Sequence, residues 1–179
     1  MSRISRLEKD EVSPALRTLY ASVGAQRGKV PNMFRAFAHR PEILETLVAH
    51  LDAVTLTGTV SRRTKELVIV LVSRLNACGY CDRSHTRQAL EHGASSEQLE
   101  TILDFEHGPF DEAEKAALAY GKQLTLDAHA IDDALFARLA AHYDEGEIVE
   151  LSAMAGLFNY FNRVNDALRI ESTRAGEGL

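Results

Sequence analysis

The sequence of 179 residues predicts an all-α protein. First, apolar residues recur at helical spacing: in residues 41–56 they occupy positions 43, 44, 47, 48, 51 and 54. Second, all four prolines stand at the edges of predicted helices, where a missing backbone N–H costs least. Third, no segment alternates apolar and polar residues with the period of two that marks a half-buried strand. These patterns indicate a compact helical domain.

Prolines and capping residues define the N-terminal helices. Ser13 followed by Pro14 is an N-cap and first-turn pair, and it begins a helix that we expect to end at Gly24. Pro31 begins a short apolar turn, PNMFRAFA. The helix over residues 41–56 follows, and a glycine two residues later is expected to end the segment.

The central segment holds the most apolar stretch of the chain. Ser61 is the predicted N-cap of a helix over residues 62–77, whose centre is the run LVIVLV. Alone, that run is also compatible with a buried strand, but the flanking Arg, Lys, Glu and Leu residues favour a buried helix. The next segment, CDRSHTRQALEHG, is predicted to be helical up to Gly93. Further helices are predicted over residues 96–104, 111–125, 132–143 and 147–168.

The length fits one domain over residues 1–179, with a core at about 41–125 and C-terminal helices at 131–170. A weak internal repeat is also visible. Aligning Glu66 with Glu147 places Asn159 and Asn162 opposite the two cysteines of the chain. Two helical hairpins of common origin would explain this match, and so would chance. These asparagines belong to a group of polar residues on an otherwise apolar predicted helix: Asn159, Asn162, Arg163 and Asp166. This group would either line a site or bridge a subunit interface.

Charge and composition exclude several classes of partner. The net charge of −6 argues against nucleic acid, which needs a basic patch. No apolar run approaches the roughly 20 residues that span a bilayer, so no membrane partner is expected. The N-terminal stretch MSRISRLEKDEV is polar and has no signal-peptide core. We therefore expect a cytoplasmic protein, in which thiols stay reduced and a structural disulfide is disfavoured.

The stretch CGYCDRSH contains the only two cysteines of the chain, Cys78 and Cys81, followed by His85. Their spacing puts all three on one helical stripe if a helix begins at Cys78. The positive end of a helix favours a thiolate, and an imidazole one turn away can move its proton. Two other interpretations stay open: a pair of small buried hydrophobes, or three ligands of a zinc site completed by a carboxylate.

Glu66 lies twelve residues before Cys78, on the preceding predicted helix. A glutamate in a helix is usually a solvated surface residue. The alternative is a carboxylate that faces His85 across the helical hairpin, where it would orient the imidazole and relay a proton.

Together, Glu66, Cys78, Cys81 and His85 have a spacing that resembles the active-site signature of alkylhydroperoxidase D-like proteins, which belong to the carboxymuconolactone decarboxylase superfamily. The likeness extends beyond the signature and covers about residues 5–170. Three segments are similar to the family's N-terminal segment, its core hairpin and the C-terminal segment of its peroxidase-related branch: VPNMFRAFAHRPEILE, SRRTKELVIVLVSRLNACGYCDRSH and LFNYFNRVNDAL.

The resemblance implies an all-helical homo-oligomer that acts as a dithiol peroxidase without a cofactor. It implies that Cys81 is the attacking thiolate, Cys78 its resolving partner, and Glu66 with His85 the proton relay. The implied partners are a hydroperoxide substrate and a dithiol reductant, either a lipoyl group or a thioredoxin-like protein.

One position departs from the family pattern. Alkylhydroperoxidase D itself has a histidine directly before the second cysteine, where this chain has Tyr80. A tyrosine donates a hydrogen bond but is a poor base near neutral pH, because the pKa of an unperturbed phenol side chain is about 10. The alternatives are a non-redox oligomer with a Cys/His/Glu zinc site and a lyase of the carboxymuconolactone decarboxylase type. The decarboxylase branch lacks the cysteine pair, which disfavours the lyase.

Overall fold

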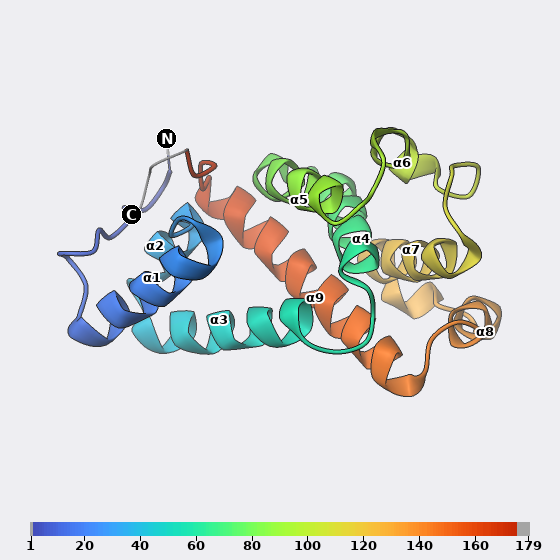
Figure 1. The fold of residues 1–179 in the computed structure, drawn as a ribbon, viewed down its shortest axis with the longest axis horizontal. Coiled ribbons are helices and arrows are strands. Elements are labelled where there is room, and N and C mark those ends of the chain that lie inside the picture. Colours follow the sequence, from blue (N-terminus) through green and yellow to red (C-terminus); the bar gives the residue numbers. More distant parts are fainter. Residues whose placement is uncertain (1, 175–179) are drawn as a thin grey trace. The chain divides into compact units, whose positions relative to one another are not determined.

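The computed structural model describes residues 2–174 and contains only helices and loops in that range (Figure 1). The all-α prediction is therefore confirmed. The helices are α1 Pro14–Arg27, α2 Asn32–Phe37, α3 Pro41–Leu56, α4 Arg62–Leu75, α5 Gly79–Glu91, α6 Ser96–Thr101, the 3₁₀ turn η1 Ile102–Asp104, α7 Glu112–Leu126, the 3₁₀ turn η2 Ala128–Ala130, α8 Asp133–Ala140 and α9 Glu145–Leu168.

Most helix ends lie where the capping residues place them. Ser13 and Ser61 accept hydrogen bonds from the first turns of α1 and α4, as predicted. The predicted end of α1 at Gly24 is wrong, because the helix continues to Arg27. Gly28 ends it instead, with φ of 69° and its N–H donated to the Gly24 carbonyl oxygen. A left-handed residue closes a helix, and a glycine with helical φ does not.

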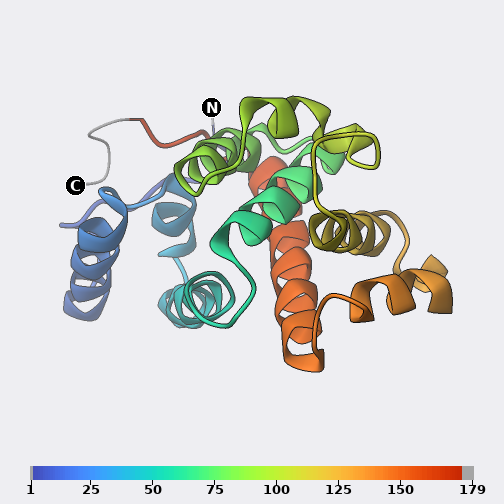
Figure 2. The same cartoon turned by 45° about the vertical axis from the view of Figure 1, so that its right-hand side comes forward.

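The described residues divide into two compact units, one formed by residues 51–164 and the other by residues 2–50 together with residues 165–174. In the unit of residues 51–164, α4 is the central helix. Its run from Leu67 to Val72 is 0–1% exposed, which confirms the buried helix expected there. The helix packs on α5, α7 and η1 (Figures 1 and 2). A hydrogen bond from Asn162 to Ser73 and an ion pair between Lys65 and Glu150 link it to α9. The single-domain organisation stays a prediction.

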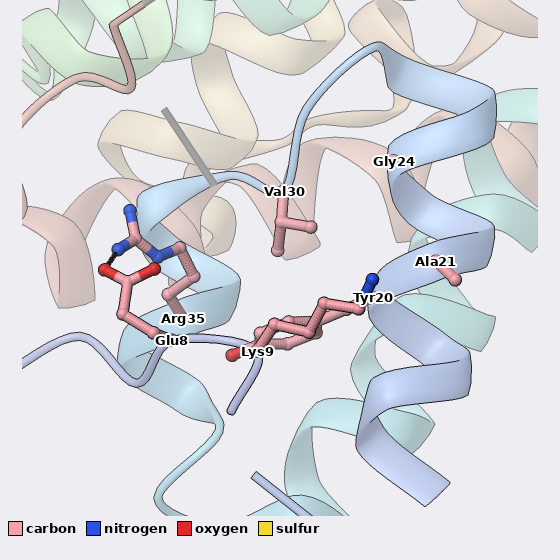
Figure 3. A pocket seen from close by; sticks show the side chains of 7 residues that line it. All are labelled: Glu8, Lys9, Tyr20, Ala21, Gly24, Val30 and Arg35. Carbon is pink, nitrogen blue, oxygen red and sulfur yellow. Dashed lines mark ion pairs between the residues drawn. The ribbon is translucent and has the colours of Figure 1, made fainter. Parts of the chain in front are cut away.

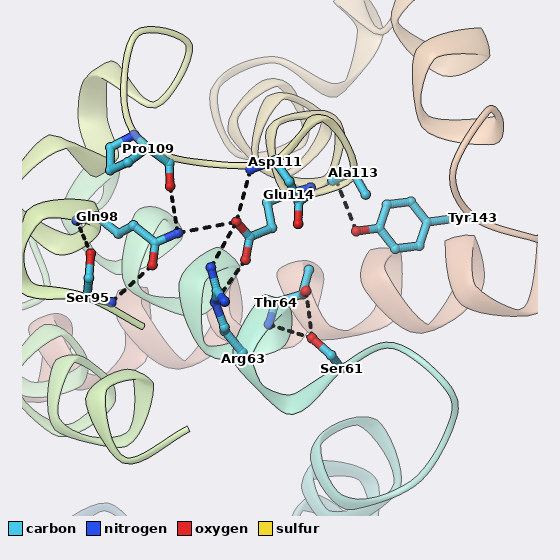
Figure 4. Close-up of polar contacts among 10 residues, drawn as sticks. All are labelled: Ser61, Arg63, Thr64, Ser95, Gln98, Pro109, Asp111, Ala113, Glu114 and Tyr143. Carbon is cyan, nitrogen blue, oxygen red and sulfur yellow. Dashed lines mark hydrogen bonds and ion pairs between the residues drawn. The ribbon is translucent and has the colours of Figure 1, made fainter. Parts of the chain in front are cut away.

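The N-terminal half of α4 makes polar contacts with three helices. Lys65 forms an ion pair with Glu150 of α9, and Arg63 Nε lies 3.0 Å from Glu114 Oε1 of α7. Glu114 also accepts a hydrogen bond from Gln98 Nε2 at 3.2 Å, inside the polar network drawn in Figure 4. The third contact, made by Glu66, is described with the site below.

The proposed repeat is not reflected in matching local structure. Its first copy, from Glu66 to Cys81, runs through the turn between α4 and α5. Its second copy, from Glu147 to Asn162, lies in the uninterrupted helix α9. The second copy is thus a single helix where a hairpin was expected, since the Ala77 turn has no counterpart there.

The other unit contains α1 and α2, and a pocket of about 210 Å³ lies between α1 and the preceding segment (Figure 3). Arg35, buried at its edge, is held by an ion pair with Glu8 and a hydrogen bond of 2.9 Å to Asn32 Oδ1. None of the predicted site residues lines this pocket. Within residues 2–174, no helix combines the length and apolar character needed to cross a bilayer.

Candidate functional site

The turn between α4 and α5 positions both cysteines. Ala77 adopts a left-handed conformation with φ of 56°, and the Cys78 N–H then donates to the Ser73 carbonyl oxygen at 2.9 Å. Cys78 is the N-cap of α5, which places Cys81 in the first turn of the helix. Neither cysteine is in a disulfide, and both are buried, at 0% and 3% exposure. The expected helix start at Cys78 is thus present.

Glu66 of α4 and His85 of α5 face each other across the hairpin. His85 Nδ1 lies 2.6 Å from Glu66 Oε2, and the carboxylate is fully buried. Because a carboxylate only accepts, Nδ1 is the donor. The second ring nitrogen, Nε2, is then left to exchange a proton with a reacting group. The sequence predicted this pair as the functional alternative to a surface glutamate.

Arg62 is a further residue of the site that the sequence reasoning missed. Its Nη2 lies 2.7 Å from Glu66 Oε1, one turn along α4. The hydrogen bonds of the guanidinium go to other acceptors: Nη1 donates to the Thr55 carbonyl oxygen and Nη2 to Gln88 Oε1 at 3.1 Å, while Glu66 Oε1 accepts no hydrogen bond from residues 2–174. Arg62 therefore acts on Glu66 through its charge more than through a hydrogen bond.

Electrostatics keep the Glu66 carboxyl ionised. Burial alone raises its pKa, because a charge is poorly solvated inside the protein. The interaction with His85 and the charge of Arg62 outweigh burial, so the pKa of Glu66 lies below its usual value. A buried carboxylate that stays charged can stabilise an imidazolium beside it when His85 takes up a proton.

Phe158 of α9 completes the surroundings of the imidazole. Its ring meets the His85 ring edge to face, with centroids 4.8 Å apart and planes at 84°. Such aromatic pairs add to the packing that fixes a side chain. Tyr80, the departure from the family pattern, lies between the cysteines in the first turn of α5 and is half-buried.

Polar side chains of α9 contact the turn that carries Cys78. Asn76 Nδ2 donates to Asn159 Oδ1 at 2.9 Å and to Asn162 Oδ1 at 3.1 Å. Asn76, Asn159 and Asn162 are called the asparagine cluster below. Asn159 and Asn162 therefore contact the cysteine-bearing turn, and the two roles expected for the α9 residues, lining the site or bridging a subunit interface, stay predictions. The sequence indicated their polar character but not this partner.

Metal binding was an alternative for the cysteines and the histidine. Across residues 2–174, His, Cys, Asp and Glu side chains form no group of three or more that could hold a metal ion. The zinc alternative therefore has no ligand set in this part of the chain.

Comparison with known proteins identifies the family. The carboxymuconolactone decarboxylase family matches residues 41–123, which include α3, α4, α5 and all four predicted catalytic residues. The uncharacterized protein YnjA of Escherichia coli is 30% identical over 144 residues, covering 80% of this chain and 74% of YnjA. The chain belongs to the carboxymuconolactone decarboxylase family. A second relative of this chain, the uncharacterized protein YdfG of Bacillus subtilis, is 28% identical to it over 124 residues, covering 68% of this chain and 84% of YdfG.

Solved structures share the fold of this family member. An alkylhydroperoxidase AhpD core, an uncharacterized peroxidase-related protein from Ralstonia eutropha JMP134, superposes with a TM-score of 0.87 at 22% identity, over 96% of this chain and 92% of its own. The resemblance to alkylhydroperoxidase D-like proteins is thus confirmed at the level of the fold. A cysteine-to-alanine variant of the debrominase Bmp8, solved in complex with 2,3,4-tribromopyrrole, has a TM-score of 0.84 at 19% identity, over 98% of this chain and 95% of its own. A debrominase thus shares the fold of this chain.

Proposed function

We propose that this protein is a dithiol peroxidase that reduces hydroperoxides through Cys78 and Cys81, with Glu66 and His85 as its proton relay. The observation that carries the proposal is the 2.6 Å hydrogen bond between His85 and the buried Glu66, on the same two helices that meet at the cysteine pair. A structural thiol pair needs no such acid–base pair beside it. A thiolate that attacks a peroxide does, because a proton must reach the departing oxygen.

The first step is the attack of the Cys81 thiolate on the peroxide. The sulfur–oxygen bond forms as the oxygen–oxygen bond breaks, leaving a sulfenic acid on Cys81 and releasing an alcohol. His85, as imidazolium, supplies the proton that the alkoxide takes up. Because Cys81 and His85 are four residues apart on α5, their side chains project from the same face of the helix.

The second step converts the sulfenic acid on Cys81 into a disulfide. The Cys78 thiol attacks the Cys81 sulfenic sulfur, a disulfide forms, and the hydroxide leaves as water with the thiol proton. An external dithiol, a lipoyl group or a thioredoxin-like protein, then reduces the disulfide by thiol–disulfide exchange. The sum is one hydroperoxide and one dithiol giving one alcohol, one water and one disulfide. We place this cycle in the cytoplasm, where such reductants operate, and in a homo-oligomer.

Peroxide consumption by the purified protein tests the proposal. With dihydrolipoamide as reductant, the wild type should consume hydrogen peroxide or an alkyl hydroperoxide, and Cys81→Ser should not. Cys78→Ser should complete one oxidation and then stall as a sulfenic acid, which dimedone labels and mass spectrometry detects. Peroxide consumption that survives Cys81→Ser would contradict the mechanism.

The same preparation separates the other activities. Stoichiometric zinc in the purified protein, with thiols that react only after chelation, would replace the redox role with a metal site. A lyase of the decarboxylase type would keep its activity when both cysteines are changed to serine. Loss of bromide from a bromopyrrole, with no peroxide consumption, would indicate the chemistry named for the structural neighbour Bmp8 instead.

A further inference from the structure

The asparagine cluster ties α9 to the turn that ends in Cys78. Asn162 is fully buried, and its Nδ2 donates to Ser73 Oγ at 3.3 Å while its Oδ1 accepts from Asn76. Asn159 is 9% exposed and donates from Nδ2 to Thr125 Oγ1 at 3.0 Å on α7. The Asn159 side-chain oxygen also accepts from Arg163 Nη1 at 2.7 Å. The side chain of Asn76 is thus held by α9, and α7 supports this contact indirectly through Asn159.

The residues held by the cluster are those that set the backbone of Cys78. Ser73 accepts two hydrogen bonds. Its hydroxyl oxygen accepts one from the Asn162 side chain, and its carbonyl oxygen accepts one from the Cys78 N–H. Between them, Ala77 is held at φ of 56°, a conformation that costs a residue with a side chain about 1 kcal/mol or more. Such a conformation persists only where surrounding contacts impose it. The cluster provides these contacts from α9.

We propose that Asn76, Asn159 and Asn162 are positioning residues for Cys78, holding it where its thiol closes the disulfide with Cys81. This role rests on the proposed function and concerns its second step. Cys81 lies in the first helical turn of α5, whereas Cys78 lies at the N-cap and its backbone conformation depends on the preceding turn. Loss of the cluster should therefore slow disulfide closure and leave the attack on peroxide nearly unchanged.

The two steps are separated by quench-flow with dimedone and mass spectrometry, which follow the sulfenic acid and the disulfide over time. We expect Asn162→Leu and Asn76→Ala to slow disulfide closure about tenfold or more, since a small misplacement of a reacting group costs up to about 100-fold. Sulfenic acid formation should change by less than about twofold because the Cys81 environment is kept. Under excess peroxide, the longer-lived sulfenic acid should be oxidised further to sulfinic acid.

Ser152→Ala is the matched control. Ser152 also lies on α9, and its hydroxyl is 2.7 Å from Tyr120 Oη of α7, away from the turn. Its loss removes a part-buried hydrogen bond of the same helix without touching the cluster. Asn76 is half-exposed, so Asn76→Ala keeps the test usable if the buried Asn162→Leu variant does not fold.

Unchanged closure in the cluster variants, or an equal loss in both steps and in Ser152→Ala, would overturn the positioning role while leaving the peroxidase intact. If the wild type forms no sulfenic acid at all, the proposed function fails and the positioning role fails with it. The two failures are therefore distinguishable in a single set of time courses.

Discussion

Glu66 holds His85 with one carboxylate oxygen and Arg62 with the other, at 2.6 Å and 2.7 Å. The carboxylate is fully buried, so each contact is made in a poorly screened environment. This arrangement orients the imidazole and keeps a negative charge beside it. The pKa of the Glu66 carboxyl therefore depends on His85, which the sequence indicated, and on Arg62, which it did not.

Replacing Glu66 with Gln should lower kcat/KM for peroxide by about 100-fold or more, the usual contribution of a positioned acid–base group. The amide keeps the shape but loses the charge that stabilises the imidazolium. The control is Glu114→Gln, another buried glutamate, which contacts Arg63 and Gln98 and lies outside the site. Steady-state assays of both variants decide the matter, and equal losses would assign Glu66 a structural role only.

Arg62→Gln should move the acid limb of the pH–rate profile to higher pH. The Arg62 charge contributes to the lowered pKa of Glu66, so its removal lets that pKa rise. The relay needs the carboxylate, and activity should then be lost at a higher pH than in the wild type. Arg63→Gln is the matched control, because the adjacent arginine pairs with Glu114 instead. Coincident profiles of Arg62→Gln and the wild type would refute the electrostatic role.

Folding stability should depend on the protonation of Glu66 with a definite sign. Because the pKa of Glu66 is lowered on folding from its ordinary value of 4.5, its ionisation stabilises the fold above that value. That contribution is lost as the pH falls through the folded pKa. Urea unfolding should therefore show that the deficit of Glu66→Gln relative to the wild type shrinks between about pH 6 and pH 3. A deficit that is constant with pH would contradict this linkage.

Glu114 should show the opposite dependence. Burial raises its pKa above 4.5, and this outweighs the charge of Arg63, which lowers it. The group therefore favours the folded state most when protonated, and that contribution is lost as the pH rises through the folded pKa. Relative to the wild type, Glu114→Gln should gain stability from about pH 4 to pH 7 in the same urea titrations. A relative loss over this range would show that the ion pair with Arg63 dominates.

The core of α4 gives a stability prediction independent of the chemistry. Ile69 is fully buried in the middle of the helix. Ile69→Ala should cost about 2–5 kcal/mol and Ile69→Val about 0.5–1.5 kcal/mol, because the larger deletion leaves a larger cavity. Chemical denaturation measures both. Near-equal values for the two variants would mean that the surrounding side chains collapse into the space.

Local sequence signals predicted the helices well because their causes are local. The run LVIVLV and the N-cap Ser61 identified α4, the helix that positions Glu66. Gly24 was misinterpreted because a glycine ends a helix only when the backbone reaches a left-handed φ, which depends on where the chain must turn. Gly28 meets that condition, with φ of 69°.

Within the site, the sequence identified Glu66 and His85 from their spacing to the two cysteines, on two predicted helices that follow one another in the chain. Arg62 carried a weaker signal, the i to i+4 spacing that places it beside Glu66 on α4. Phe158 and the asparagines of α9 could not be assigned partners, since their contacts depend on how distant helices pack. The proximity of Asn76 to Asn159 joins positions 83 residues apart in the chain.

The left-handed turn at Ala77 depends on residues that are distant in the sequence, whereas the proposed site residues are close together in it. The proposed reacting groups lie within twenty consecutive residues, from Glu66 to His85, so a graft of this hairpin onto another helical scaffold would carry all of them. The turn would arrive without the amide groups of α9 that hold it in this protein. A designer who wanted a working disulfide would therefore also have to supply a crossing helix with asparagines three residues apart.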